Sequence, residues 1–142
     1  MARSRRTTRI VLILTGLLLV LCCGVVVAGT VTYRSIQAAA GPARDATTAF
    51  LAHLKADETS AAYASLCPAA RARFSEADFA GIVHNRPRVQ SYSISATNVA
   101  TVNGEVSGTV TADIRYADGS SEKRAIPLVK DGDTWRICGQ PY

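Results

Sequence analysis

Residues 106–116 read VSGTVTADIRY, a run in which apolar and polar side chains alternate. Successive side chains of a β-strand point to opposite faces of its sheet, so the alternation predicts a strand with one buried face and one solvent face. The residues expected to be buried are Val106, Val110, Ala112, Ile114 and Tyr116, and those between them are Ser107, Thr109, Thr111, Asp113 and Arg115.

Three dipeptides divide the chain around this run into segments of strand length. They are Asn103-Gly104, Asp118-Gly119 and Asp131-Gly132. Each joins a residue that tolerates positive φ to a glycine, the combination that type I′ hairpin turns require. We therefore expect four antiparallel strands joined by hairpins.

The two outer strands carry weaker signals of the same kind. Tyr92, Ile94 and Ala96 alternate with polar residues before the first turn, and Trp135 and Ile137 follow the last one. We expect Trp135 and Ile137 to face the helices, because large apolar side chains gain most from burial.

The first half of the chain has helical spacing. One helix is predicted from Pro42 to Ala56, and a second, capped by Asp57 or Thr59, is ended or redirected by Pro68. A third begins at a capping box, Ser75 to Asp78. The apolar faces are Ala46, Phe50, Leu51 and Leu54 in the first helix, Ala61, Tyr63 and Leu66 in the second, and Phe79, Ile82 and Val83 in the third. Helices followed by hairpins predict an α+β fold, with three helices packed on one face of a four-stranded antiparallel sheet.

An uncharged apolar segment precedes this domain, from Ile10 to Val31. As a helix it spans about 33 Å, enough to cross the hydrocarbon core of a bilayer. Four arginines precede it and one follows it, so the positive-inside rule places the N-terminus in the cytoplasm. The predicted organisation is a basic cytoplasmic N-terminus at 1–9, a transmembrane helix at 10–31, a tether at 32–41 and an extracytoplasmic α+β domain at 42–142.

Two alternatives concern this apolar segment. It could be a cleaved export signal, although its apolar core is longer than such signals have. It could also drive homodimerisation, because Gly24 and Ala28 form a small-xxx-small pattern that lets two helices approach closely.

The charge distribution excludes one class of function. Of the 16 basic residues, five lie in residues 1–34, and the remaining 11 are matched by all 11 acidic residues. The predicted outer domain is therefore formally neutral. Nucleic-acid binding needs a basic face on the folded domain, so we expect no nucleic-acid partner.

Cys67 and Cys138 are the only cysteines of the predicted outer domain. A pair of cysteines on the oxidising side of a membrane predicts a disulfide, here tying the helical half to the last strand. The two cysteines lack the C-x-x-C spacing and the neighbouring histidine that would favour a redox couple.

The sequence contains no catalytic, cofactor-binding or metal-binding motif that we recognise. His53 and His84 lie at helical positions without cysteines or carboxylates at ligand spacing, which favours ordinary surface or helix-terminal roles. We therefore predict no cofactor and no metal site.

Four segments together resemble bacterial membrane-tethered proteins with a nuclear-transport-factor-2-like, or cystatin-like, domain of unknown function. The segments are Ala49–Ala52, Ala62–Leu66, Tyr116–Ser120 and Gly132–Cys138. The resemblance covers about residues 42–139 and implies a curved sheet wrapped around helices to form a cone, sometimes with a cavity. Enzymes of that family line the cavity with acidic, tyrosine or histidine residues; no such set matches here, so no catalytic role carries over.

Three functional hypotheses follow from these observations. The first is a non-enzymatic extracytoplasmic module, held in the lipid bilayer by residues 10–31, that binds an unknown protein or small ligand. The second is a small isomerase, dehydratase or hydrolase whose cavity is lined by Tyr63, His53 or Asp78. The third is a membrane scaffold or accessory subunit that dimerises through Gly24 and Ala28.

Overall fold

The structure is a computed structural model that describes residues 40–139. The predicted cytoplasmic N-terminus, the membrane helix at 10–31 and the Gly24–Ala28 pattern lie outside these residues. Within residues 40–139, no helix is both long enough and apolar enough to cross a membrane.

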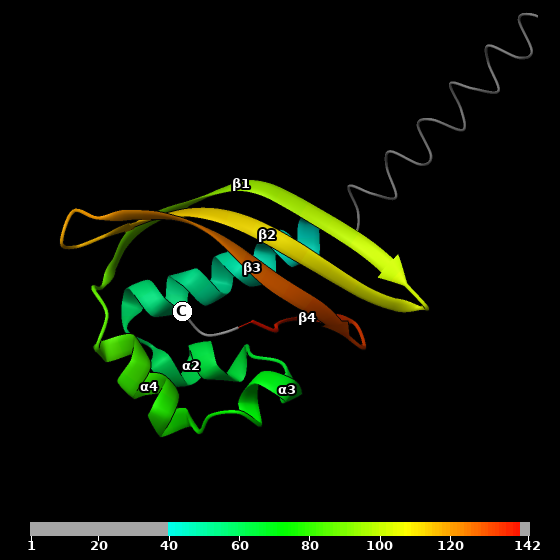
Figure 1. The fold of residues 1–142 in the computed structure, drawn as a ribbon, viewed down its shortest axis with the longest axis horizontal. Coiled ribbons are helices and arrows are strands. Elements are labelled where there is room, and N and C mark those ends of the chain that lie inside the picture. Colours follow the sequence, from blue (N-terminus) through cyan, green and yellow to red (C-terminus); the bar gives the residue numbers. More distant parts are fainter. Residues whose placement is uncertain (1–39, 140–142) are drawn as a thin grey trace, which may run out of the picture. The chain divides into compact units, whose positions relative to one another are not determined.

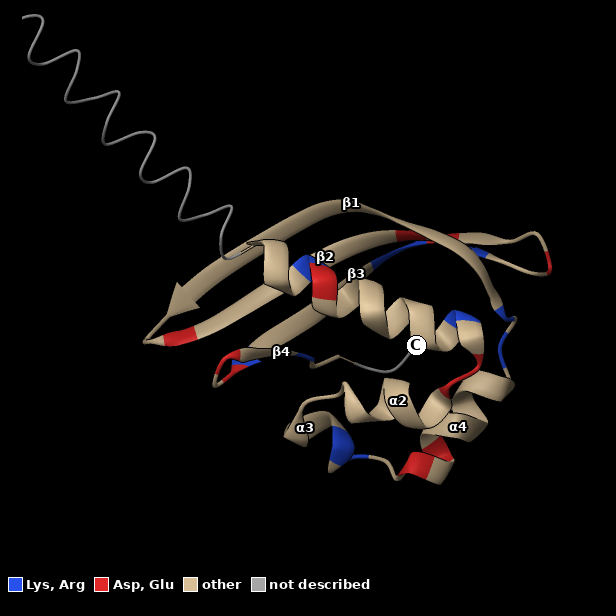
Figure 2. Ribbon diagram, turned by 180° about the vertical axis from the view of Figure 1, so that it is seen from behind, with Lys and Arg blue, Asp and Glu red and all other residues tan. Residues whose placement is uncertain are grey.

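The helices come first along the chain, as predicted. The first is helical through residues 40–56 and is drawn in cyan in Figure 1. It is followed by α2 (Thr59–Ala64), α3 (Pro68–Arg71) and α4 (Glu76–His84). In both Figure 1 and Figure 2 the first helix lies beneath the sheet, with α2, α3 and α4 below it.

A four-stranded antiparallel sheet forms the second half. Its strands are β1 (Val89–Val102), β2 (Glu105–Tyr116), β3 (Ser121–Asp131) and β4 (Thr134–Ile137), in the spatial order β1-β2-β3-β4. The α+β class, the meander and the helices on one face of the sheet are therefore confirmed. Figure 1 shows the sheet curving over the helices, and β1 has register shifts at Val89/Ser91 and Ile94/Ala96, where β-bulges increase bending.

The core fills the space between the sheet and the first helix. The predicted inward residues Val110, Ala112, Ile114 and Tyr116 are buried, while Val106 is half-buried. Trp135 and Ile137 are also buried, as expected. The helices contribute Phe50, Leu51, Leu54, Ala62 and Phe79 to the same cluster, and Leu66, which follows α2, also belongs to it.

The turns agree with the prediction in position but only partly in type. Asn103 and Gly104 both have positive φ, 52° and 85°, as a type I′ turn requires. In the other two turns only Gly119 and Gly132 have positive φ. The type I′ assignment is therefore wrong for these two, because the preceding aspartates keep ordinary backbone angles.

Two helix predictions need correction. The predicted number of three helices is wrong for residues 40–139: α2 ends at Ala64, before Leu66, and Pro68 redirects the chain into a fourth, short helix, α3, whose first turn tolerates the missing N–H. Neither Asp57 nor Thr59 caps α2: the N-cap is Glu58, without a side-chain bond, and Asp57 adopts a φ of 65° after the first helix. The capping box of α4, by contrast, is confirmed with Ser75 and Asp78.

Candidate functional site

An open groove lies where the β1–β2 turn, the β3–β4 turn and the start of α3 meet. Its volume is about 770 Å³, within the range of ligand-binding sites, which is about 300–1,000 Å³. Its walls come from three parts of the chain that are far apart in sequence. The lining residues are Cys67, Pro68, Ala69, Val102, Asn103, Gly104, Glu105, Val106, Ser107, Val129, Lys130, Asp131, Gly132 and Cys138.

The disulfide fixes one wall of this groove. Cys67 and Cys138 are bonded, with 5.2 Å between their Cα atoms, so the predicted pair lies at disulfide distance. Main-chain bonds support it: the Cys67 N–H donates to the Ile137 carbonyl at 2.8 Å, and the Cys138 N–H donates to the Pro127 carbonyl at 2.8 Å. The start of α3 is thereby held against the end of the sheet.

A close contact between Trp135 and Gly108 fixes the neighbouring part of the sheet. A Cβ added at Gly108 would lie 3.2 Å from Cζ3 of the Trp135 ring and 3.1 Å from the Asn98 carbonyl oxygen. Both distances are tighter than ordinary van der Waals contact, so glycine lets the ring lie against β2 without a shift of the neighbouring atoms. The indole of β4 therefore reaches over β3 and contacts β2, which ties β4 to the sheet beyond its own neighbour β3.

The groove combines exposed apolar side chains with charged ones. Val102 is 61% exposed, an unusual position for a large apolar side chain, and the half-buried Val106 and Val129 continue the apolar surface. Glu105, Lys130 and Asp131 supply charges of both signs at its border. In residues 40–139, no group of three His, Cys, Asp or Glu side chains could hold a metal ion.

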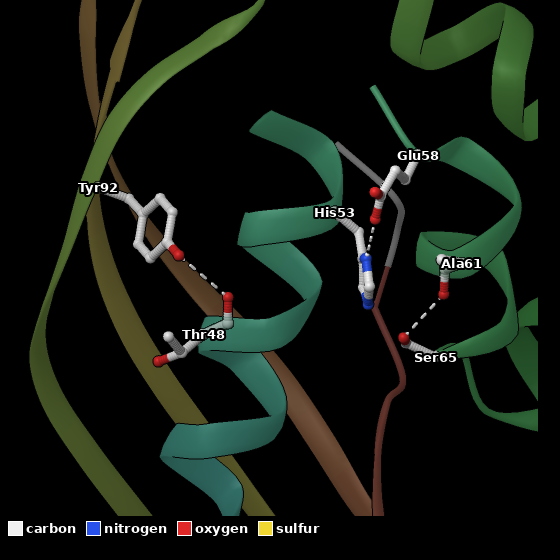
Figure 3. Close-up of polar contacts among 6 residues, drawn as sticks. All are labelled: Thr48, His53, Glu58, Ala61, Ser65 and Tyr92. Carbon is white, nitrogen blue, oxygen red and sulfur yellow. Dashed lines mark hydrogen bonds and ion pairs between the residues drawn. The ribbon is translucent and has the colours of Figure 1, made fainter. Parts of the chain in front are cut away.

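The three residues suggested for an enzymatic cavity each have other partners. The Tyr63 hydroxyl donates to the Phe74 carbonyl at 3.1 Å, and its ring lies 5.9 Å from that of Phe79. His53 contacts Glu58 through Nδ1 at 2.7 Å, and Figure 3 shows this pair at the end of the first helix. Asp78 belongs to the α4 capping box. None of these three side chains lines the groove.

The pocket between the first helix and β3 is small. It has a volume of about 30 Å³ and is lined mainly by apolar side chains such as Phe50, Leu54 and Ile126. That volume holds a water molecule or two but not a substrate. None of Tyr63, His53 and Asp78 lines it.

Tyr92 of β1 donates a hydrogen bond to the Thr48 carbonyl at 3.2 Å, which holds the sheet against the first helix (Figure 3).

The ionised carboxylate of Asp78 contributes to the stability of the fold. The Ser75 hydroxyl and N–H donate to Asp78 Oδ2 at 2.7 and 3.0 Å, and these bonds lower the pKa of Asp78 below 3.8. A lowered pKa stabilises the fold above the unfolded-state pKa, and this stabilisation is lost as the pH falls through the folded-state pKa.

We therefore expect Asp78→Asn to lower the urea midpoint at neutral pH, with the difference from the native chain shrinking as the pH falls below 3.8. Asp133→Asn, in the exposed β3–β4 turn, is the matched control. A midpoint difference for Asp78→Asn that is the same at neutral and acidic pH would contradict this assignment.

A second polar cluster was missed by the sequence reasoning. Asp57 accepts from Arg88 Nη2 at 2.6 Å through Oδ2, and its Oδ1 lies 3.3 Å from His84 Nε2. The cluster joins the end of the first helix to the end of α4 and the start of β1. All three side chains are substantially exposed, which favours a modest structural role. The signal in the sequence was weak, because Asp57 and Arg88 are 31 residues apart.

Comparisons with known proteins bear on the fold alone. No protein-family model and no curated protein matches the chain. Among solved structures, a Campylobacter jejuni protein described as an NTF2-like transpeptidase aligns with a TM-score of 0.49 and 13% identity, over 68% of this chain and 97% of that one. A sec-c motif containing protein from Psychrobacter arcticus aligns with a TM-score of 0.53 and 10% identity, over 70% of this chain.

The chain spans 60% of the length of the Psychrobacter protein. At 10% identity that likeness shows a shared fold and nothing of activity. The four-stranded antiparallel sheet with several helices on one face fits the nuclear-transport-factor-2-like fold that the sequence resemblance implies.

Proposed function

We propose that the domain is a non-enzymatic protein-interaction module, held outside the cytoplasm by the membrane helix at residues 10–31. The groove beside the disulfide is its binding surface. The observation that carries the proposal is the exposed Val102 at the border of an open groove of about 770 Å³. Together with Val106 and Val129, Val102 forms a continuous apolar surface bordered by charged residues, an arrangement typical of interaction sites.

The shape of the groove favours an extended segment of a partner protein over a small molecule. The groove is open to solvent, and its lining combines apolar side chains with polar and charged groups. A peptide offers both kinds of contact, and few of its side chains have to be fully enclosed. The disulfide keeps the walls in place before binding, which lowers the entropic cost of association.

A site-specific photocrosslinker tests this proposal in intact cells. Placed at Val102 of the full chain, it should give a discrete adduct with one other protein, identified by mass spectrometry as a different chain and not a second copy of this one. Placed at Ile82, the exposed apolar residue of α4 that lies away from the groove, it should give none. An adduct formed equally at both positions, or none at Val102, would contradict the proposal.

A second variant tests whether the groove itself is occupied. Ala69 is exposed at the start of α3 and lines the groove, so Ala69→Lys places a long charged side chain in it without disturbing the core. We expect the yield of the Val102 adduct to fall about tenfold or more, the effect of losing one well-packed contact. An unchanged yield would place the partner elsewhere.

A further inference from the structure

The two edges of the sheet differ in how they are protected. At the β4 edge, the segment Ser65–Cys67 runs alongside the strand: the Ile137 N–H donates to the Ser65 carbonyl at 3.0 Å, and the Ile137 carbonyl accepts from the Cys67 N–H at 2.8 Å. Leu66 and Ile137 form a parallel bridge there. This edge is therefore short and already covered.

β3 extends beyond the short strand β4 at one end and is protected by its composition. This part contains Glu122, Lys123 and Arg124, followed by Pro127. Charged residues and proline on an edge prevent another strand from pairing with it. Figure 2 shows these charges on β3.

β1 has neither kind of protection. Within residues 40–139 it pairs with β2 only, and it forms one side of the sheet. Its 14 residues, VQSYSISATNVATV, include no Lys, Arg, Asp, Glu, Pro or Gly. In Figure 2, β1 carries no charged residue along its length, while β2 and β3 do. A long uncharged edge of this kind is a template for strand pairing.

The bulges limit the part of β1 that can pair with a further strand. The register shifts at Val89/Ser91 and Ile94/Ala96 disturb the first half of β1. From Ala96 to Val102 the pairing with β2 is regular, running from Ala96 opposite Thr111 to Val102 opposite Glu105. The outer edge of this seven-residue segment is therefore regular as well, which a partner strand requires.

We propose that this segment, Ala96–Val102, pairs antiparallel with the same segment of a second copy of the chain, joining two sheets into one. Self-pairing about a two-fold axis places the residues next to the axis near their own counterparts, so a charge there would lie close to a like charge. The segment has none. An axis at Val99 sets Thr97 opposite Thr101 and Ala96 opposite Val102, and such threonine and small apolar pairs are favourable across strands.

This interface and the groove share Val102, but the other groove walls, α3 and the β3–β4 turn, take no part in the pairing. A dimer through β1 leaves α3 and the β3–β4 turn free, so either proposal can fail alone. It also differs from dimerisation through Gly24 and Ala28, which would bring together membrane helices and not strands.

Crosslinking between isotopically distinct copies tests the interface directly. A photocrosslinker is placed at the exposed residue Asn98, and equal amounts of unlabelled and nitrogen-15-labelled full chain are mixed in detergent. We expect mixed-isotope adducts whose mapped peptides join β1 of one copy to β1 of the other. Adducts mapping to another segment, or adducts within single copies only, would overturn the proposal.

Charge substitutions separate pairing from a general loss of structure. Ala100→Lys, on the free edge, should reduce the mixed-isotope adduct about tenfold or more, because the two introduced ammonium groups become diagonal neighbours across the axis at Val99 and repel each other. Ala125→Lys, an equally exposed alanine on the already charged β3, should leave it unchanged. Mixing Ala100→Lys with Ala100→Glu chains should restore the adduct; failure to restore it, or equal loss with Ala125→Lys, would exclude the β1 interface.

Discussion

Replacing Cys138 with serine should lower the free energy of unfolding by about 4 kcal/mol. The disulfide joins residues 71 positions apart, and closing a loop of that length restricts the unfolded chain by about this amount in the chain-entropy model. Cys138 is the better residue to change, because it is only half-buried whereas Cys67 is 1% exposed. The measurement is a urea titration of the oxidised native chain and the variant, followed by tryptophan fluorescence.

Reduction of the native chain provides the matched control for this variant. A reductant should shift the native transition to that of Cys138→Ser and leave the variant itself unmoved. The loss is large beside the total stability of a domain this size, about 5–15 kcal/mol. If native and variant chains unfold at the same urea concentration, the bond does not contribute to stability as proposed.

The sheet could be predicted from the sequence because its signals are local. The alternation in residues 106–116 and the glycine of each hairpin turn depend on neighbouring residues only, and all three turns lie where they were expected. The capping box of α4 is equally local, since Ser75 and Asp78 are three residues apart. The cysteine pairing needed no geometry either, because the predicted outer domain has only two cysteines.

Features that depend on contacts between distant segments could not be predicted in this way. Asp57 was interpreted as a helix cap, yet its carboxylate is bound by Arg88, which the fold alone brings near it. The groove combines α3 with two hairpin turns, and no pattern within any one of them indicates that they meet. Tyr63 was suggested for a cavity, but its hydroxyl is bound by the Phe74 carbonyl.

The free edge of β1 lies between these cases. The absence of charge from Val89 to Val102 can be seen in the sequence, but whether this run can pair with another strand depends on the strand order. In an interior strand an uncharged run is ordinary, whereas at an edge it is a surface for pairing. The strand order β1-β2-β3-β4 therefore changes the interpretation of residues whose identity was already known.

Truncation of Phe79 should have an effect as large as loss of the disulfide, about 3–5 kcal/mol. Phe79 is fully buried on α4, where its ring packs against Tyr63 of α2 at 5.9 Å. Phe79→Ala removes most of a large side chain from a site held between two helices, and the cavity left behind adds to the lost burial. Urea titration of the full chain, with the disulfide intact, measures the change.

Ile82 on the same helix supplies the control for Phe79. It is 36% exposed, so Ile82→Ala makes a comparable truncation in α4 without opening an internal cavity, and we expect a loss of about 1 kcal/mol or less. The contrast tests whether α4 belongs to the core through this one side chain. If both variants lose the same small amount, α4 packs loosely; if both lose several kcal/mol, the helix itself is the sensitive element and burial of Phe79 is not the cause.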